Sequence, residues 1–145
     1  MNRLGIYCGL LLVFLSPAIA ASSAADLEQY DVVWTEQSKD SSESMPVGGH
    51  GIGLNVWVEN GDVLFYMQRS GSLSENGEYL KLGRIRIRLE PNPFKECTSF
   101  RQELRLREST VEIEGRGTDQ GRSIKALVRV WVDVGEPVIY VDVDS

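Results

Sequence analysis

Hydrophobic and polar residues alternate along most of the chain from Tyr30 onward, with a period of two and not the 3.6 of a helix. The clearest alternations occupy residues 84–89, 104–107, 111–114, 128–133 and 141–144. In each of them every second residue is Val, Ile or Leu, and the residues between are mostly charged. Segments of this kind form β-strands with one buried face. No segment shows a convincing helical stripe, so the sequence predicts an all-β protein.

Turn-forming residues separate these segments. They are Asn60-Gly61, Asn76-Gly77, Pro91-Asn92-Pro93, Gly115-Arg116-Gly117 and Gly135-Glu136-Pro137. Glycine, proline and asparagine at such points interrupt regular structure and favour tight turns. Seven or eight short strands joined by turns predict an antiparallel β-sandwich over residues 30–145.

The pair Asn60-Gly61 predicts a hairpin, because both residues accept the positive φ angles of a type I′ turn. Pairing outward from this turn gives one face that is entirely apolar, made of Leu54, Val56, Val58, Val63, Phe65 and Met67. The opposite face carries Asn55, Trp57, Leu64 and Tyr66. Such a face suits a protein partner or a sugar ring, since aromatic and amide groups serve both. The alternative is that a loop or second sheet of the same domain covers it.

The N-terminus has the features of a secretory signal peptide at residues 1–20. Arg3 gives a positive start, residues 4–15 are apolar, and Ala18 and Ala20 stand at the small positions of a cleavage site. The apolar run is shorter than the roughly 20 residues that span a bilayer. We therefore expect cleavage after Ala20, a linker over residues 21–29, and a secreted or periplasmic product with no membrane attachment.

Charge and composition exclude several classes of function. The chain has 15 basic and 21 acidic residues, a net charge of -6, so we expect no nucleic-acid partner. Only one histidine, His50, is available for a nucleophilic triad, and no metal site or cofactor is expected. Of the two cysteines, Cys8 lies in the signal peptide, so Cys97 would remain unpaired.

A glycine-rich segment precedes the first strand of the hairpin. Residues 44–53 read SMPVGGHGIG, with four glycines in the last six positions. They match no phosphate-binding loop, because no GxxxxGK[ST] pattern and no following helix are present. Glycines at this density permit tight turning and a close approach of another backbone or a ligand. His50 could donate or accept hydrogen bonds in a cleft, or lie solvated in a turn.

Residues 30–94 resemble the N-terminal domain of secreted bacterial proteins known as domain-of-unknown-function family 5703. Residues 100–110 (FRQELRLREST) and 128–145 (VRVWVDVGEPVIYVDVDS) extend the resemblance over almost all of the chain after the signal peptide. That family is in turn similar to the N-terminal β super-sandwich of inverting α-L-fucosidase-type glycoside hydrolases. There a Met-Pro-Leu-Gly-Asn-Gly segment opens a strand. Here Met45-Pro46-Val47-Gly48-Gly49-His50-Gly51 takes its place, and the asparagine is absent.

The resemblance implies a non-catalytic N-terminal β-sandwich module of an exported glycoside-hydrolase-like protein. In such hydrolases the catalytic carboxylates belong to an α/α-barrel domain that follows the sandwich and is missing here. We expect the module to pack on that domain and to shape its carbohydrate cleft. The residues expected to contact carbohydrate or the second domain are Gly48, Gly49, His50, Gly51, Asn55, Trp57 and Tyr66.

Two other functions remain open. A free-standing carbohydrate-binding module would use Trp57 and Tyr66 as stacking platforms. A complete small hydrolase would need Glu59 with Asp62, or Glu75 with Glu78, as acid and base, but neither pair has a signature beyond proximity. We therefore expect no catalytic residues in this chain. The last strand, predicted over residues 137–144, could form an unpaired edge through which the chain associates with itself.

Overall fold

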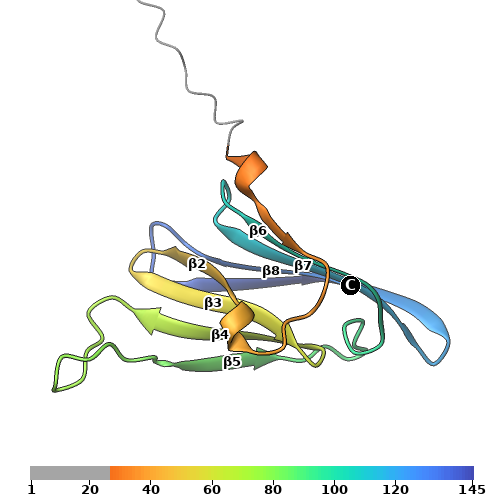
Figure 1. The fold of residues 1–145 in the computed structure, drawn as a ribbon, viewed down its shortest axis with the longest axis horizontal. Helices are drawn as coiled ribbons and strands as arrows, with labels where there is room; N and C mark the ends of the chain where they lie inside the picture. The colour runs from red at the N-terminus through yellow and green to blue at the C-terminus, as the bar shows by residue number, and fades with distance from the viewer. Residues whose placement is uncertain (1–26) are drawn as a thin grey trace, which may run out of the picture.

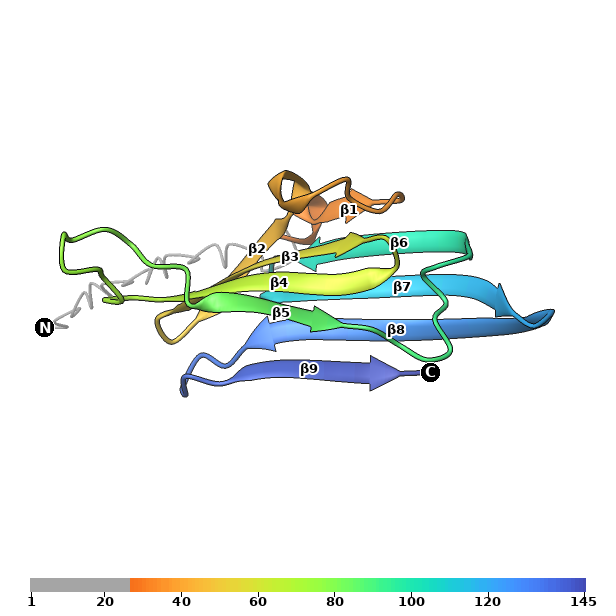
Figure 2. The ribbon, with the colours of Figure 1, turned by 90° about the horizontal axis from the view of Figure 1, so that it is seen from below.

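The computed structural model describes residues 27–145, which form two antiparallel β-sheets packed face to face (Figures 1 and 2). One sheet has the strand order β1-β6-β7-β8-β9 and the other the order β2-β3-β4-β5. The strands are β1 (Val32–Trp34), β2 (Met45–Gly49), β3 (Ile52–Glu59), β4 (Asp62–Arg69), β5 (Gly83–Ile87), β6 (Cys97–Arg105), β7 (Thr110–Asp119), β8 (Arg122–Val132) and β9 (Ile139–Asp144). Two 3₁₀ turns, η2 (Glu28–Tyr30) and η3 (Ser41–Glu43), complete the described elements. The predicted β-sandwich is confirmed, with nine strands.

The predicted signal peptide and residues 21–26 of the predicted linker lie outside the described residues. Within residues 27–145, no helix has the length and apolar character needed to cross a membrane.

The hairpin of β3 and β4 has the register predicted from its turn. Asn60 and Gly61 have φ angles of 53° and 80°. Val58 pairs with Val63 and Val56 with Phe65, and the same pairing continues to the far end of the hairpin. Since side chains alternate between faces, this register puts all the apolar residues of one face against the other sheet.

The core lies between the sheets and is built mainly from valine. Val56, Val58 and Val63 of one sheet meet Val111, Val128 and Val130 of the other, and all six are completely buried. β-branched side chains suit this position, because they pack closely on a pleated surface. Gln102 of β6 is also fully buried, and its Nε2 donates to the carbonyl oxygen of Val56 across the sandwich at 3.3 Å.

One predicted turn proves wrong. Gly115-Arg116-Gly117 does not end a strand but lies inside β7, which continues to Asp119. A Cβ at Gly115 would lie 2.3 Å from the ring of Phe94, and a Cβ at Gly117 would lie 2.7 Å from the carbonyl oxygen of Pro93. These glycines therefore make room for the loop between β5 and β6. The turn itself is at Gln120-Gly121, where both φ angles are positive.

The segment between β1 and β2, residues 35–44, connects the two sheets, and we call it the strap (Figure 1). Gln37 fixes it, since its Oε1 accepts from the Gly61 backbone N–H at 2.9 Å and its Nε2 donates to the Phe94 carbonyl at 2.6 Å. The buried Ser38 extends the attachment by donating its backbone N–H to Val58 at 2.8 Å. A single amide side chain thus ties the strap to two loops.

Candidate functional site

The glycine segment forms the end of β2 and the turn into β3. His50 and Gly51 have φ angles of 40° and 77°, which is the left-handed region that glycine tolerates best. A Cβ at Gly49 would lie 2.7 Å from the backbone oxygen of Asp133, and one at Gly48 would lie 2.7 Å from that of Ile52. The glycines thus allow the tip of this hairpin to lie directly against the end of β8. Among the described residues His50 is exposed and forms no hydrogen bond.

The structure brings Asn55 and Tyr66 together, away from that turn. They pair across β3 and β4, as do Gly53 and Gln68, and the four residues form the floor of a hollow of about 200 Å³ on the outer face of the sheet. Ser41 of η3 and Lys81, which precedes β5, also line it, together with Met67. We call this site the outer hollow. Neither His50 nor Gly48, Gly49 or Gly51 lines it.

The aromatic residues of this face are mostly covered. Trp57 and Leu64 are only 1% and 2% exposed. The ring of Tyr66 lies 5.0 Å from that of Trp57, and the ammonium of Lys81 lies 4.4 Å from the Tyr66 ring centre. For Trp57 and Leu64, cover by the same domain is the alternative observed. Trp57 therefore offers no ring to a ligand, whereas Asn55 is exposed and Tyr66 is half-buried.

Five of the seven residues that line the outer hollow were not expected at a site from the sequence, namely Ser41, Gly53, Met67, Gln68 and Lys81. Lys81 and Gln68 stand in no motif, and Ser41 belongs to the strap, whose position depends on long-range contacts. Gly53 could have been found, because the hairpin register places it on the outer face next to Asn55. No heavy atom lies within 4 Å of where its Cβ would be.

The carboxylates weighed as an acid–base pair are engaged elsewhere. Asp62 is buried and accepts hydrogen bonds from Arg88 at 2.8 and 2.7 Å and from Arg86 at 3.0 Å. These hydrogen bonds, above all the one from Arg88, lower the pKa of Asp62, although burial of the carboxylate acts to raise it. Glu59 accepts from Trp57 Nε1 at 3.0 Å. Both carboxylates thus hold the sheet's outer face together.

The second predicted pair is exposed on the long connection between β4 and β5. Glu75 and Glu78 both lie at the surface there. The backbone N–H of Glu78 donates to the Ser74 hydroxyl at 3.1 Å. Neither glutamate lines the outer hollow or the two further hollows described below.

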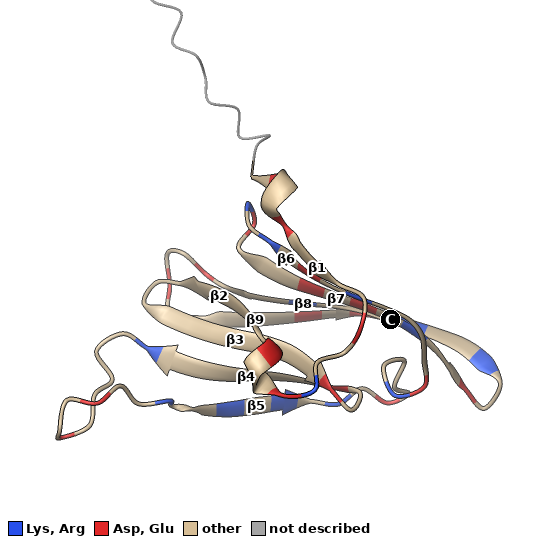
Figure 3. Cartoon of the chain, viewed as in Figure 1, with Lys and Arg blue, Asp and Glu red and all other residues tan. Residues whose placement is uncertain are grey.

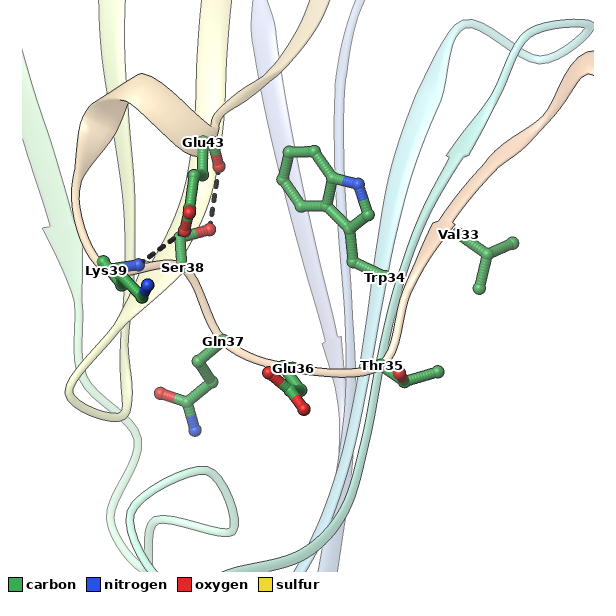
Figure 4. A pocket seen from close by; sticks show the side chains of 8 residues that line it. All are labelled: Val33, Trp34, Thr35, Glu36, Gln37, Ser38, Lys39 and Glu43. Atoms are coloured by element: carbon green, nitrogen blue, oxygen red, sulfur yellow. Dashed lines mark hydrogen bonds between the residues drawn. The ribbon is translucent and has the colours of Figure 1, made fainter.

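A larger hollow of about 490 Å³ lies along the strap. Figure 4 shows Trp34 on the side facing Ser38 and Glu43, whereas Gln37 is turned away. The Ser38 hydroxyl donates to the Glu43 carbonyl, and the Lys39 backbone N–H donates to the Glu43 carboxylate, both at 2.8 Å. All the residues that line this hollow belong to one segment, 33–43. We therefore attribute the hollow to the path that the strap follows.

The sandwich is open along one side, where β5 and β9 are the edge strands of their sheets (Figure 2). Ile85 pairs with Phe65, and Val141 and Val143 pair with Val130 and Val128, so all three face inward like their core partners. They nevertheless remain about 40% exposed. A hollow of about 340 Å³ lies at one end of this side, between Leu89 and Val143. We call this surface the open edge.

Comparison with known proteins assigns the chain to a family. No curated protein and no solved structure matches it. The family described as "Domain of unknown function (DUF5703)" matches through its N-terminal domain over residues 33–145, which includes β2 to β9 and most of β1. The chain therefore belongs to the DUF5703 family, of which it carries the N-terminal domain.

Proposed function

We propose that this domain is a non-catalytic N-terminal β-sandwich module of an exported glycoside-hydrolase-like protein, and that it packs on that protein's catalytic α/α-barrel domain. The open edge is the observation that carries the proposal. Inward-facing residues of a sandwich are normally buried, whereas Ile85, Val141 and Val143 are substantially exposed here. An apolar strip of this kind on a folded domain marks a surface that another domain covers.

The carboxylates of the domain agree with a non-catalytic role. Hydrolysis of a glycosidic bond needs an acid and a base or nucleophile on opposite sides of one cleft. Asp62 is held by two arginines and Glu59 by Trp57, so protonating a leaving group would break contacts that hold the sheet. The catalytic acid and base would belong to the barrel domain.

The test is complex formation with the catalytic α/α-barrel domain that the proposal assigns to the same protein, measured by sedimentation velocity. Val141→Asp should abolish the complex, because it puts a charge in the middle of the apolar strip. Val134→Asp is the matched control, since Val134 is 81% exposed in the loop between β8 and β9 and does not belong to the strip. No complex with the unmodified domain, or equal complexes with both variants, would contradict the proposal.

A free-standing carbohydrate-binding module is the second candidate, and the outer hollow favours it. Amide, hydroxyl and ammonium groups surround a floor that contains glycine, and sugars bind such groups through their hydroxyls. In this case the domain would bind a saccharide without the barrel domain. The Val141→Asp variant would bind the saccharide with the same affinity as the unmodified protein.

A further inference from the structure

We propose that the outer hollow binds one uronic acid residue of an acidic polysaccharide, with Lys81 pairing with the carboxylate and Asn55 and Gln68 hydrogen-bonding the hydroxyls. The inference rests on the proposed function only in taking the ligand to be a sugar. It adds the class of sugar and the residues that select it.

The size of the hollow suits one sugar ring. Pockets for drug-sized ligands occupy roughly 300–1,000 Å³, whereas this hollow has about 200 Å³. Gly53 gives the space, because the position its side chain would take is empty. Its cross-strand partner Gln68 and its neighbour Asn55 stand on either side of that space.

The polar groups of the hollow have hydrogen-bonding capacity to spare. Asn55 uses its Nδ2 to donate to the Ser44 hydroxyl at 3.0 Å, which leaves its carbonyl oxygen to accept. Within residues 27–145, the Gln68 side chain makes no hydrogen bond, so its amide can both donate and accept. Such amides recognise neighbouring hydroxyls of a sugar ring.

The charge around the hollow favours an anion. No carboxylate lines it, and among the described residues Lys81 forms no salt bridge. Arg84, opposite Tyr66 on β5, has no acidic partner there either. Figure 3 shows basic residues along β5, of which Arg86 pairs with Asp62, as does Arg88 just beyond the strand.

The acidic residues nearest in sequence to Ser41 are directed elsewhere. Asp40 accepts from the Ser42 backbone N–H at 2.7 Å, and Glu43 accepts from the Lys39 backbone N–H. One ammonium at the hollow matches one carboxylate, whereas phosphate sites usually combine arginines or several backbone N–H groups. The geometry therefore favours a uronate over a phosphorylated sugar.

Titration calorimetry of the purified protein with two oligosaccharides of equal length tests the proposal. One is an oligomer of galacturonic acid and the other the neutral oligomer of galactose. We expect the acidic oligomer to bind at least tenfold more tightly, and this preference to weaken as salt is raised, because exposed charges are screened. Lys81→Met should remove the preference, and Lys95→Met, at another exposed lysine, should leave it unchanged.

A second variant tests the position of the sugar. Gly53→Gln should abolish binding by filling the floor, and its melting temperature should stay near that of the unmodified protein, since a Cβ at this position has no heavy atom within 4 Å and the rest of the side chain can extend into the hollow. Equal affinity for both oligomers, or binding that survives Gly53→Gln, would overturn the proposal. Absence of binding to either oligomer at millimolar concentration would overturn it too. None of these outcomes affects complex formation through the open edge, so failure here is distinct from failure of the proposed function.

Discussion

Asp62 shows how a single buried charge can hold one face of a sheet. Asp62 lies at the start of β4, and its side chain is only 4% exposed. The two arginines that reach it from the β5 side keep their charged groups partly in water, with side chains 52% and 63% exposed. The carboxylate is therefore the desolvated member of the cluster, and its stabilisation depends on both hydrogen bonds and charge.

Asp62→Asn should lower the free energy of unfolding by about 1–2 kcal/mol at pH 7, a modest cost because the arginines can return to water. The pKa of Asp62 is lowered by folding. Its contribution is thus complete above the unfolded-state pKa of about 3.9 and is lost as the pH falls through the lower folded-state value. Urea unfolding measures the free energy of unfolding of the Asp62→Asn variant and of the unmodified protein at pH 7, 5 and 2.5. The difference between them should be the same at pH 7 and pH 5 and smaller at pH 2.5.

Glu114→Gln is the control for this experiment, because Glu114 forms an exposed pair with Arg116 at 3.0 Å. Exposed pairs contribute little, so a change within about 0.5 kcal/mol is expected. A difference between Asp62→Asn and the unmodified protein that stayed constant down to pH 2.5 would show that hydrogen bonding alone, without the charge, accounts for the effect.

At the scale of elements, the hairpin of β2 and β3 depends on glycine for contact with the other sheet. Gly49→Ala should destabilise the protein by about 2 kcal/mol or more, because the new Cβ meets backbone oxygens of Val132 and Asp133 that cannot easily move. Gly53→Ala, four residues along the same hairpin, should change stability by less than about 0.5 kcal/mol, since its Cβ meets nothing. Thermal melts of both variants check this, and equal melting temperatures would contradict the close-contact interpretation.

The strands and turns also show how much of the fold could be predicted from the sequence. Asn60-Gly61 fixes the β3–β4 register, because a two-residue turn leaves only one way to pair the strands. Gly115 was misread as a turn, since the reason for it is Phe94, twenty-one residues earlier and on a different element. The position of Ser41 likewise depends on where the strap attaches, and the cover over Trp57 includes Tyr66 of the neighbouring strand. Local patterns predict elements, whereas these features arise from contacts between elements.

For the whole molecule, the open edge predicts self-association of the isolated domain. β5 and β9 leave unpaired backbone groups beside exposed Ile85, Val141 and Val143, and edges of this kind recruit other chains. Burying ~300 Å² of apolar surface would contribute about 7 kcal/mol before the cost of association. Sedimentation velocity at micromolar concentration should therefore show dimers or larger species.

Val141→Asp should shift this distribution toward monomer, and Val134→Asp should not. Trp57 is unsuitable for such a test, because it is buried and its replacement would destabilise the domain by several kcal/mol. A sharp monomer peak for the unmodified protein would show that the open edge is stable in water without a partner.

The position of β1 sets the order in which the fold can be completed. This strand is the first among the described residues 27–145, yet within them its one sheet neighbour is β6, and Val32 pairs with Leu104 more than seventy residues later. During synthesis β1 must therefore wait, unpaired, until most of the domain has been made, and loop closure over such a distance slows folding. The hairpins β2–β3 and β3–β4 can form early, because their strands are adjacent in the chain. The strand that is made before the eight others is thus among the last to be paired.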